Sequence, residues 1–286
     1  MSASHFRTLL VLGRVSNLPT VWSNCLAAWL LAGGSYGSKF ALLLASGSCL
    51  YLGGMVLNDA CDVEFDRRHR TERPIPSGRI SRRAAWAWAI GGLLAGALLA
   101  VPMGGRALGC ALVLLTAIVA YDLWHKRHPC VLGLVAGCRF LLYLLAGIAA
   151  VGTASPRLLT AAGGLAAYVL GISLLARHES GMSRPSKWPL VLLALPVVTA
   201  GLNTSAGAFG VTIFAMVLFI AWLVATLGPL WRAKPQTGRG ISWLLAGLVL
   251  ADGLQVSTVQ PSWTQAVVLT GLFGLTLLLQ RRIPAT

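Results

Sequence analysis

The sequence predicts an all-α protein, a polytopic transmembrane helical bundle of nine to ten spans. Of its 286 residues, 56% are hydrophobic and only 11% are charged, whereas charged residues make up about a quarter of a typical soluble domain. The apolar residues come in blocks of roughly 15 to 22, and about 20 helical residues cross the hydrocarbon layer of a bilayer. Helices are the expected spanning elements because each helix satisfies its own backbone hydrogen bonds in lipid.

Ten apolar segments are candidate spans, and we expect one domain over the whole chain, residues 1–286. In chain order the segments cover residues 16–33, 39–60, 84–102, 107–122, 130–151, 158–176, 188–202, 207–228, 241–257 and 263–280. Two of them are weaker predictions: segment 188–202 is short and contains two prolines, and segment 241–257 carries Asp252 near membrane depth. A re-entrant or broken helix at either place would lower the count.

Basic residues test this count, because loops on the cytoplasmic side of a membrane collect Lys and Arg. The formal net charge is +15, and 19 of the 23 basic residues lie in alternate connections between the predicted spans. Both termini and the connection after the second span are therefore predicted to be cytoplasmic, in what we expect to be a bacterial inner membrane. A charge distributed loop by loop in this way argues against nucleic-acid binding.

Acidic residues are scarce, and they are concentrated in one stretch. Five of the eight Asp and Glu residues fall between positions 59 and 72. On a helix Asp59, Asp62 and Asp66 would share one face, with Asn58 beside it. Oxygen ligands of this kind suit Mg²⁺, which binds few carboxylates directly and fills its other positions with water and phosphate oxygens. The stretch therefore predicts a site for Mg²⁺ and a diphosphate at the cytoplasmic mouth of the bundle.

A solvated helix end is the simpler interpretation of the acidic stretch. It is less favoured because charge close to the bilayer is costly unless it faces a watery cavity, and ionisable groups within a membrane usually mark function. The following residues, 67–83, form the longest predicted cytoplasmic loop. Their Pro and Gly residues predict defined turns, and their Arg side chains suit phosphate, so this loop is a candidate lid over the site.

Three stretches of the chain resemble the UbiA superfamily of intramembrane prenyltransferases. They are N-D-A-C-D-V-E-F-D at 58–66, R-P-I-P-S-G-R-I-S at 73–81 and Y-D-L-W-H-K-R at 121–127. The first is similar to the family's N-D-x-x-D-x-x-x-D motif. The opening R-V-S-N-L-P-T-V-W-S-N at 14–24, which contains Asn17, also resembles the family's entry into its first helix.

The resemblance implies a bundle, usually of nine spans, that transfers a polyprenyl group from its diphosphate to an aromatic or other acceptor. It also implies the roles of individual residues. The first Mg²⁺- and diphosphate-binding motif, including the catalytic aspartates, would consist of Asn58, Asp59, Asp62 and Asp66. Lys126 would contact the diphosphate during catalysis, and Arg73 would belong to the lid. Further substrate contacts would come from Asn17 and Tyr121.

The family's second Asp-rich motif should follow the sixth span, but this chain has L-L-A-R-H-E-S-G-M-S at 174–183, without an aspartate. Either Glu179 holds a second Mg²⁺ with water completing its shell, or Arg177 binds phosphate directly in place of the metal. Loss of catalysis or a different substrate is the third alternative. The stretch is also similar to UbiA-like proteins of Ebo gene clusters, which are associated with bacterial secondary metabolism.

Two more ionisable residues lie within predicted spans. Arg139 should be paired or face a polar cavity, and its candidate partners are Asp122, Glu179 and the substrate. Asp252 either lines the cavity or packs at a helix break, and the second interpretation is favoured. Six aromatic side chains could shield a carbocation in a dry cavity: Trp22, Tyr51, Tyr121, Trp124, Phe140 and Tyr143. For each of them plain packing is the simpler interpretation.

We therefore predict an Mg²⁺-dependent intramembrane prenyltransferase. Its expected partners are a polyprenyl diphosphate, a hydrophobic acceptor and membrane lipid, and no nucleic acid. The alternative is a membrane carrier or lipid-binding protein that retains the acidic stretch as a degenerate, non-catalytic site.

Overall fold

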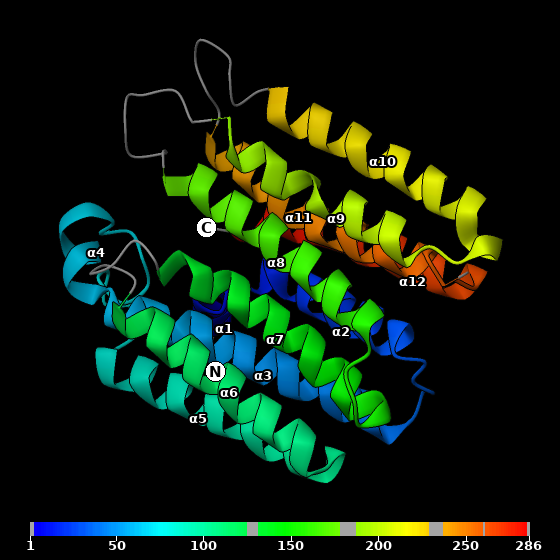
Figure 1. The fold of residues 1–286 in the computed structure, drawn as a ribbon. Coiled ribbons are helices and arrows are strands. Elements are labelled where there is room, and N and C mark those ends of the chain that lie inside the picture. Colours follow the sequence, from blue (N-terminus) through cyan, green and yellow to red (C-terminus); the bar gives the residue numbers. More distant parts are fainter. Residues whose placement is uncertain (1–2, 125–130, 178–186, 229–236, 260, 285–286) are drawn as a thin grey trace.

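The computed structural model is an all-helical bundle whose long helices lie alongside one another (Figure 1). It describes residues 3–124, 131–177, 187–228, 237–259 and 261–284, and within these ranges it contains no β-strand. The α-helices are α1 (Ala3–Leu12), α2 (Leu18–Leu31), α3 (Ser38–Cys61), α4 (Val63–His69), α5 (Arg82–Ala100), α6 (Gly105–Trp124), α7 (Leu132–Val151), α8 (Pro156–Arg177), α9 (Pro189–Asn203), α10 (Phe209–Leu227), α11 (Thr237–Ser257) and α12 (Trp263–Gln280). Short 3-10 turns are η1 (Val15–Asn17), η2 (Val101–Met103) and η5 (Ala206–Ala208).

Each of the ten predicted spans coincides with one of these helices, from α2 to α12 without the short α4. Eight helices in the described part of the chain are long and apolar enough to cross a membrane, with mean hydropathies of 1.4 to 2.5. The two shorter ones are α2, with 14 residues, and α9, with 15 residues and Pro196 in its interior. The predicted weak span around Asp252 is a continuous helix, α11, so a break there is wrong.

The connections of the bundle separate into two ends (Figure 1). The end of α3, the short α4 and the start of α5 lie at one end, together with the ends of α6, α8 and α10. The turn η2 between α5 and α6, and η5 between α9 and α10, lie at the other end. This arrangement agrees with the alternation of basic and neutral connections in the sequence. Which end faces the cytoplasm stays a prediction.

Glycine packing holds α3 against α5 and so fixes the helix that carries the acidic residues. A Cβ at Gly53 would lie 2.8 Å from the backbone nitrogen of Leu93, and one at Gly96 would lie 2.6 Å from the Leu50 side chain. Small residues let helix backbones approach closely in membranes, where association depends on packing and not on a hydrophobic driving force. The pair α3 and α5 therefore forms a rigid support for the end of α3.

Candidate functional site

The acidic stretch begins in the last turn of α3 and continues into α4. Asp62 lies at the junction, where α3 ends at Cys61 and α4 begins at Val63. Helical backbone hydrogen bonds continue across the junction. The N–H of Asp62 donates to the carbonyl of Asn58 at 3.0 Å, and the N–H of Asp66 donates to the carbonyl of Asp62 at 2.9 Å. The helix on which Asp59, Asp62 and Asp66 were expected to share one face is thus two helices joined at Asp62.

The acidic side chains are withdrawn from solvent. Asp59 and Asp66 are 6% and 1% exposed, Asn58 is also buried, and Asp62 is half-buried. Glu64, on the other side of α4, is exposed. A solvated helix end would expose its carboxylates, so this burial argues against the simpler interpretation of the stretch.

Two arginines converge on the buried carboxylates. Arg73 Nη1 lies 3.0 Å from Asp59 Oδ1 and 3.1 Å from Asp66 Oδ2, so one guanidinium bridges α3 and α4. Arg14 Nη2, just before η1, lies 3.4 Å from the same oxygen of Asp59. The contact between Arg14 and Asp59 was not predicted, although the sequence motif at 14–24 begins with Arg14.

Arg73 reaches the carboxylates from an ordered loop between α4 and α5. Ser77 donates both its backbone N–H, at 3.0 Å, and its hydroxyl, at 2.7 Å, to the carbonyl of Arg73. Gly78 has φ 75°, a left-handed conformation that glycine adopts without steric strain. The side chains of Ile75 and Ile80 are buried. The predicted defined turns are therefore present; that the loop acts as a lid stays a prediction.

The stretch at 121–127 lies beside the acidic residues through Asp122. Nδ2 of Asn58 donates to Asp122 Oδ1 at 3.1 Å, and Asp122 is buried on α6. Tyr121, its neighbour, is half-buried. Lys126, the predicted diphosphate contact, lies outside the described residues.

Arg139 has partners different from those expected. Its Nη1 donates to Asn24 Oδ1 at 2.6 Å, and its Nη2 donates to Thr20 Oγ1 at 3.1 Å. Its guanidinium carbon lies 5.9 Å from the centre of the Tyr51 ring. Pairing with Asp122 was therefore wrong: α7 turns Arg139 toward α2, where amide and hydroxyl oxygens accept its hydrogen bonds.

Asp252 belongs to the same buried network. Its Oδ2 accepts from Ser23 Oγ at 2.5 Å and from Asn24 Nδ2 at 2.6 Å, and its Oδ1 accepts from the Tyr143 hydroxyl. Asn24 thus connects Arg139 to Asp252 with its two amide atoms. The favoured interpretation of Asp252 as a packed residue at a helix break was right about the packing, since the side chain is fully buried. It was wrong about the break, because α11 continues through this position. Ser23 and Asn24 lie inside the motif at 14–24, which was the available signal for them.

The remaining predicted site residues occupy separate places. Asn17, in η1, accepts a hydrogen bond from Gln280 Nε2 of α12 at 3.2 Å. Arg177 is the last residue of α8. Glu179 lies outside the described residues, so its metal-binding role stays a prediction.

The donor chemistry of the acidic stretch fits a hard divalent cation. One oxygen of Asp66, Oδ1, is buried without a hydrogen-bond partner, while its Oδ2 pairs with Arg73. Buried carboxylate oxygens are normally satisfied, and Mg²⁺ binds oxygen ligands of this type. In the described part of the chain no three His, Cys, Asp or Glu side chains are grouped closely enough to hold a metal between them. A cation here would thus bind few carboxylates and complete its shell with other oxygens.

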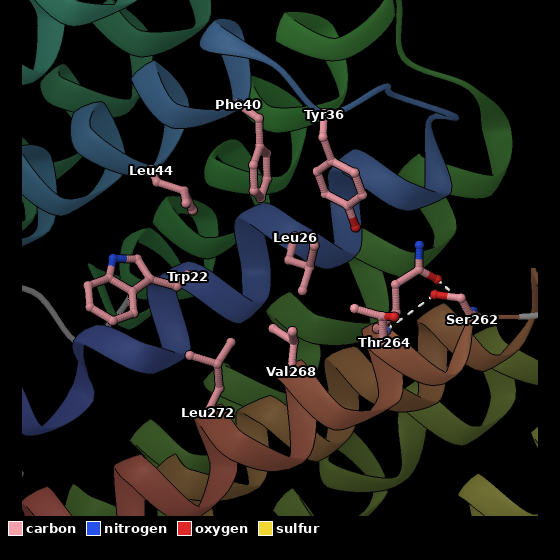
Figure 2. Close-up of a pocket in the computed structure, with 10 residues that line it drawn as sticks. Trp22, Leu26, Tyr36, Phe40, Leu44, Ser262, Thr264, Val268 and Leu272 are labelled. Atoms are coloured by element: carbon pink, nitrogen blue, oxygen red, sulfur yellow. Dashed lines mark hydrogen bonds between the residues drawn. The ribbon is translucent and has the colours of Figure 1, made fainter.

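An apolar pocket of about 310 Å³ lies farther along the bundle, between α2, the start of α3 and α12. Figure 2 shows Trp22 and Leu26 of α2 facing Val268 and Leu272 of α12, with Phe40 beside them. Trp22 is fixed by a hydrogen bond from Nε1 to Ser48 Oγ, 2.9 Å. Of the predicted aromatic wall, Trp22 is thus the member that lines this pocket, whereas Tyr143 is wholly buried in the Asp252 network.

The fold and the site together define an integral membrane helical bundle with a buried acidic site at one end. Residues 17–254 match the model of the UbiA prenyltransferase family. The chain therefore belongs to this family, which confirms the family predicted from the sequence motifs. The helices of the described residues confirm the predicted all-α fold.

Similar sequences include enzymes of archaea. Digeranylgeranylglyceryl phosphate synthase of Methanothrix thermoacetophila is 34% identical over 139 residues, covering 48% of this chain and 50% of the relative. The same enzyme of Sulfolobus acidocaldarius is 34% identical over 111 residues, covering 39% and 38%. The matches thus span about half, or less, of the length of these relatives. Both organisms are archaea, so the predicted bacterial membrane stays a prediction.

The fold is shared with solved UbiA-type proteins. A structure of digeranylgeranylglyceryl phosphate synthase has a TM-score of 0.63 at 19% identity and covers 94% of this chain and 99% of that one. A UbiA homologue from Archaeoglobus fulgidus, bound to DMAPP and Mg²⁺, has a TM-score of 0.51 at 14% identity and covers 96% and 100%. At these identities the likeness supports the fold alone.

Proposed function

We propose that the protein is an Mg²⁺-dependent prenyltransferase that moves a polyprenyl group from its diphosphate to an aromatic or lipid-like acceptor. The observation that carries the proposal is the buried pair Asp59 and Asp66, bridged by Arg73 where α3 meets α4 in a membrane bundle. Membership of the UbiA prenyltransferase family supports the reaction class, and the names of the archaeal relatives support a lipid-like acceptor.

In the proposed reaction, a metal ion and two arginines stabilise the negative charge of the diphosphate. Asn58, Asp59, Asp62 and Asp66 would hold Mg²⁺, which stabilises the negative charge of the departing diphosphate. In the transfer, the bond between the allylic carbon and the diphosphate oxygen breaks, and its electron pair leaves with the diphosphate. The acceptor then forms a bond to that carbon and loses a proton.

Arg73 would change partners when substrate binds. In the structure it neutralises Asp59 and Asp66 across 3.0 and 3.1 Å. A cation among the same carboxylates would neutralise them instead, and the guanidinium could then pair with phosphate oxygens, for which its planar fork is well suited. Arg14 lies close enough to share this role.

The apolar pocket between α2 and α12 supports the isoprenoid part of the proposal. From Leu44, which lines the pocket, to Asp59 there are 15 residues of α3, or about 22 Å of helix. An extended prenyl chain with its diphosphate at the acidic stretch would run in the direction of this pocket. Its lining by Trp22, Leu26 and Phe40 suits a hydrocarbon.

The test is transfer of label from geranyl, farnesyl and geranylgeranyl diphosphates by the purified full chain in lipid nanodiscs, with Mg²⁺ and a lipid extract as acceptor source. We expect diphosphate release that EDTA abolishes and that Asp59→Asn lowers at least about 100-fold, the lower range for loss of a metal or electrostatic catalyst. Glu64→Gln, in the same stretch but exposed, is the matched control and should retain activity.

The opposite result would separate the two classes of protein. If no diphosphate is released and Asp59→Asn leaves the cellular product unchanged, the enzyme proposal is wrong. Flux of a substrate across proteoliposomes without chemical change would then favour the carrier.

A further inference from the structure

A second cavity, of about 640 Å³, lies between the end of α10, the start of α11 and the end of α12. It is at the same end of the bundle as the acidic stretch, because α12 ends at Gln280, which contacts Asn17 of η1. The polar and aromatic residues that line it include Trp222, Thr226, Arg239, Ser242, Trp243 and Arg281. Its described lining residues include none of the sequence-motif residues discussed above, so it is separate from the candidate active site.

Two arginines make this cavity positive. The guanidinium carbon of Arg239 lies 4.8 Å from the centre of the Trp243 ring, within the range of a cation–π contact. Arg281 lines the cavity just past the end of α12. None of the described residues that line the cavity carries a carboxylate, and within the described part of the chain neither arginine forms an ion pair. Both charges are therefore available to an anion from outside the protein.

The tryptophans give the cavity an aromatic wall. The Trp222 and Trp243 rings lie 6.2 Å apart, and Trp222 Nε1 donates to the Trp243 carbonyl at 3.3 Å. The hydroxyls of Ser242 and Thr226 donate to carbonyls of their own helices. The arginines are the charged groups of the described lining that can recognise an anion. Tryptophan near helix ends is typical of the membrane–water interface, where lipid headgroups lie.

The surfaces next to the cavity are suited to hydrocarbon chains. Val224 of α10, beside the lining residue Ala225, is 68% exposed, and Leu278 of α12, beside the lining residue Leu277, is 59% exposed. α10 lies at the edge of the bundle opposite α5 (Figure 1). An occupant with an anionic head and two apolar chains would match both the cavity and these exposed faces.

We propose that this cavity binds the phosphate headgroup of an anionic membrane phospholipid, with the acyl chains along α10 and α12. Basic pockets between transmembrane helices are known to bind such headgroups. The occupied site would also stabilise η1, because Ser16 donates to the carbonyl of Pro284, another lining residue, at 3.4 Å. A phospholipid bound here would act as a structural lipid and not as the prenyl acceptor.

The test is a titration of the detergent-purified full chain with phosphatidylglycerol and phosphatidylcholine of identical chains, read by native mass spectrometry. Phosphatidylglycerol should bind more tightly, and Arg239→Gln and Arg281→Gln should each weaken it about fivefold, the effect of one basic residue at a membrane surface. Arg282→Gln is the matched control: it removes the next, exposed arginine, which does not line the cavity, and should leave the affinity unchanged.

A second measurement compares two lipids on the unmutated chain, so its main result does not depend on the folding of a variant. Phosphatidylglycerol brominated in its chains near the headgroup should quench tryptophan fluorescence more strongly than brominated phosphatidylcholine, and Trp243→Phe should reduce the difference. Equal binding or quenching by the two lipids, or equal loss in Arg282→Gln and Arg281→Gln, would overturn the proposal. Displacement of the lipid by millimolar inorganic phosphate would assign the cavity to free phosphate and would also overturn it.

Discussion

The side-chain nitrogen of Asn58 donates a hydrogen bond to Oδ1 of Asp122, 3.1 Å away, and both residues are buried. They are 64 positions apart and belong to different sequence motifs. The bond ties the end of α3 to α6. It also fixes the Asn58 amide so that its oxygen remains available to another partner, as a metal-binding role would require.

Replacement of Asp122 tests this bond. Asp122→Ala leaves a buried amide donor without its acceptor, which costs about 1 to 3 kcal/mol of the free energy of unfolding. We expect a lower thermal unfolding temperature in detergent and a lower rate of prenyl transfer. Asp122→Asn keeps an acceptor oxygen of the same size and should retain more of both. Equal losses in the two variants would contradict a positioning role for this bond.

Replacement of Arg73 tests the bridge between Asp59 and Asp66. Arg73→Gln leaves Asp66 without its cation and Asp59 with Arg14 alone, and loss of one partner of a buried ion pair costs about 3 kcal/mol or more. Because Mg²⁺ would neutralise the same carboxylates, it should stabilise Arg73→Gln more than the unmutated chain.

The measurement for Arg73→Gln is the unfolding temperature with and without Mg²⁺. Arg82→Gln is the control, since Arg82 is exposed and lies 3.9 Å from Glu64, outside the buried pair. If Mg²⁺ shifts both variants equally, the metal does not bind at Asp59 and Asp66.

The carboxylate of Asp252 holds α2, α7 and α11 together. Asp252→Ala would leave the donors of Asn24 and Tyr143 unpaired, whereas the Ser23 hydroxyl can still donate to the Thr20 carbonyl, 3.1 Å away. Each buried unpaired donor costs about 1 to 3 kcal/mol. We expect loss of folded protein or a large fall in unfolding temperature. Asp252→Asn retains one acceptor oxygen and should be intermediate. An alanine variant as stable as the unmutated chain would show that water satisfies these donors.

Close packing of α3 and α5 is tested by two glycines. In Gly53→Ala the new Cβ would lie 2.8 Å from the backbone nitrogen of Leu93, so the helices must separate, with a cost of about 1 to 3 kcal/mol. Gly91→Ala, on α5, meets no atom within 4 Å, and alanine favours a helix. Unfolding temperatures should fall for the first variant and not for the second. A tolerated Gly53→Ala would mean that α3 can move away from α5.

Local properties of the chain predicted the helices well. The span predicted at 39–60 corresponds to α3 (Ser38–Cys61), and the span predicted at 263–280 coincides with α12 (Trp263–Gln280). Hydropathy over about 20 residues determines whether a segment can enter a bilayer. It can be calculated without knowing which other helices the segment packs against. The break between α3 and α4 at Asp62 was missed because the residues around it include neither Gly nor Pro, which usually mark a helix end. The helical hydrogen bonds also continue across it, so the break is slight.

The site was predicted in composition but not in its contacts. The motif at 58–66 identified Asp59 and Asp66, whereas their partners Arg73 and Arg14 come from a loop and from the segment before η1. Arg139 was correctly expected to need polar partners, yet the expected acid was replaced by Asn24 and Thr20. A buried charge must be satisfied, but many neighbours of different types can satisfy it.

The sequence by itself determined a membrane bundle of the UbiA family and the stretch that carries its acidic residues, because hydropathy, charge and motif spacing are properties of neighbouring residues. Only the tertiary structure decided that Asn58 meets Asp122, that Arg73 bridges Asp59 and Asp66, and that Asn24 links Arg139 to Asp252. These contacts depend on the rotation and depth of each helix in the bundle. Packing between helices sets both, and residues far apart in the chain contribute to it jointly.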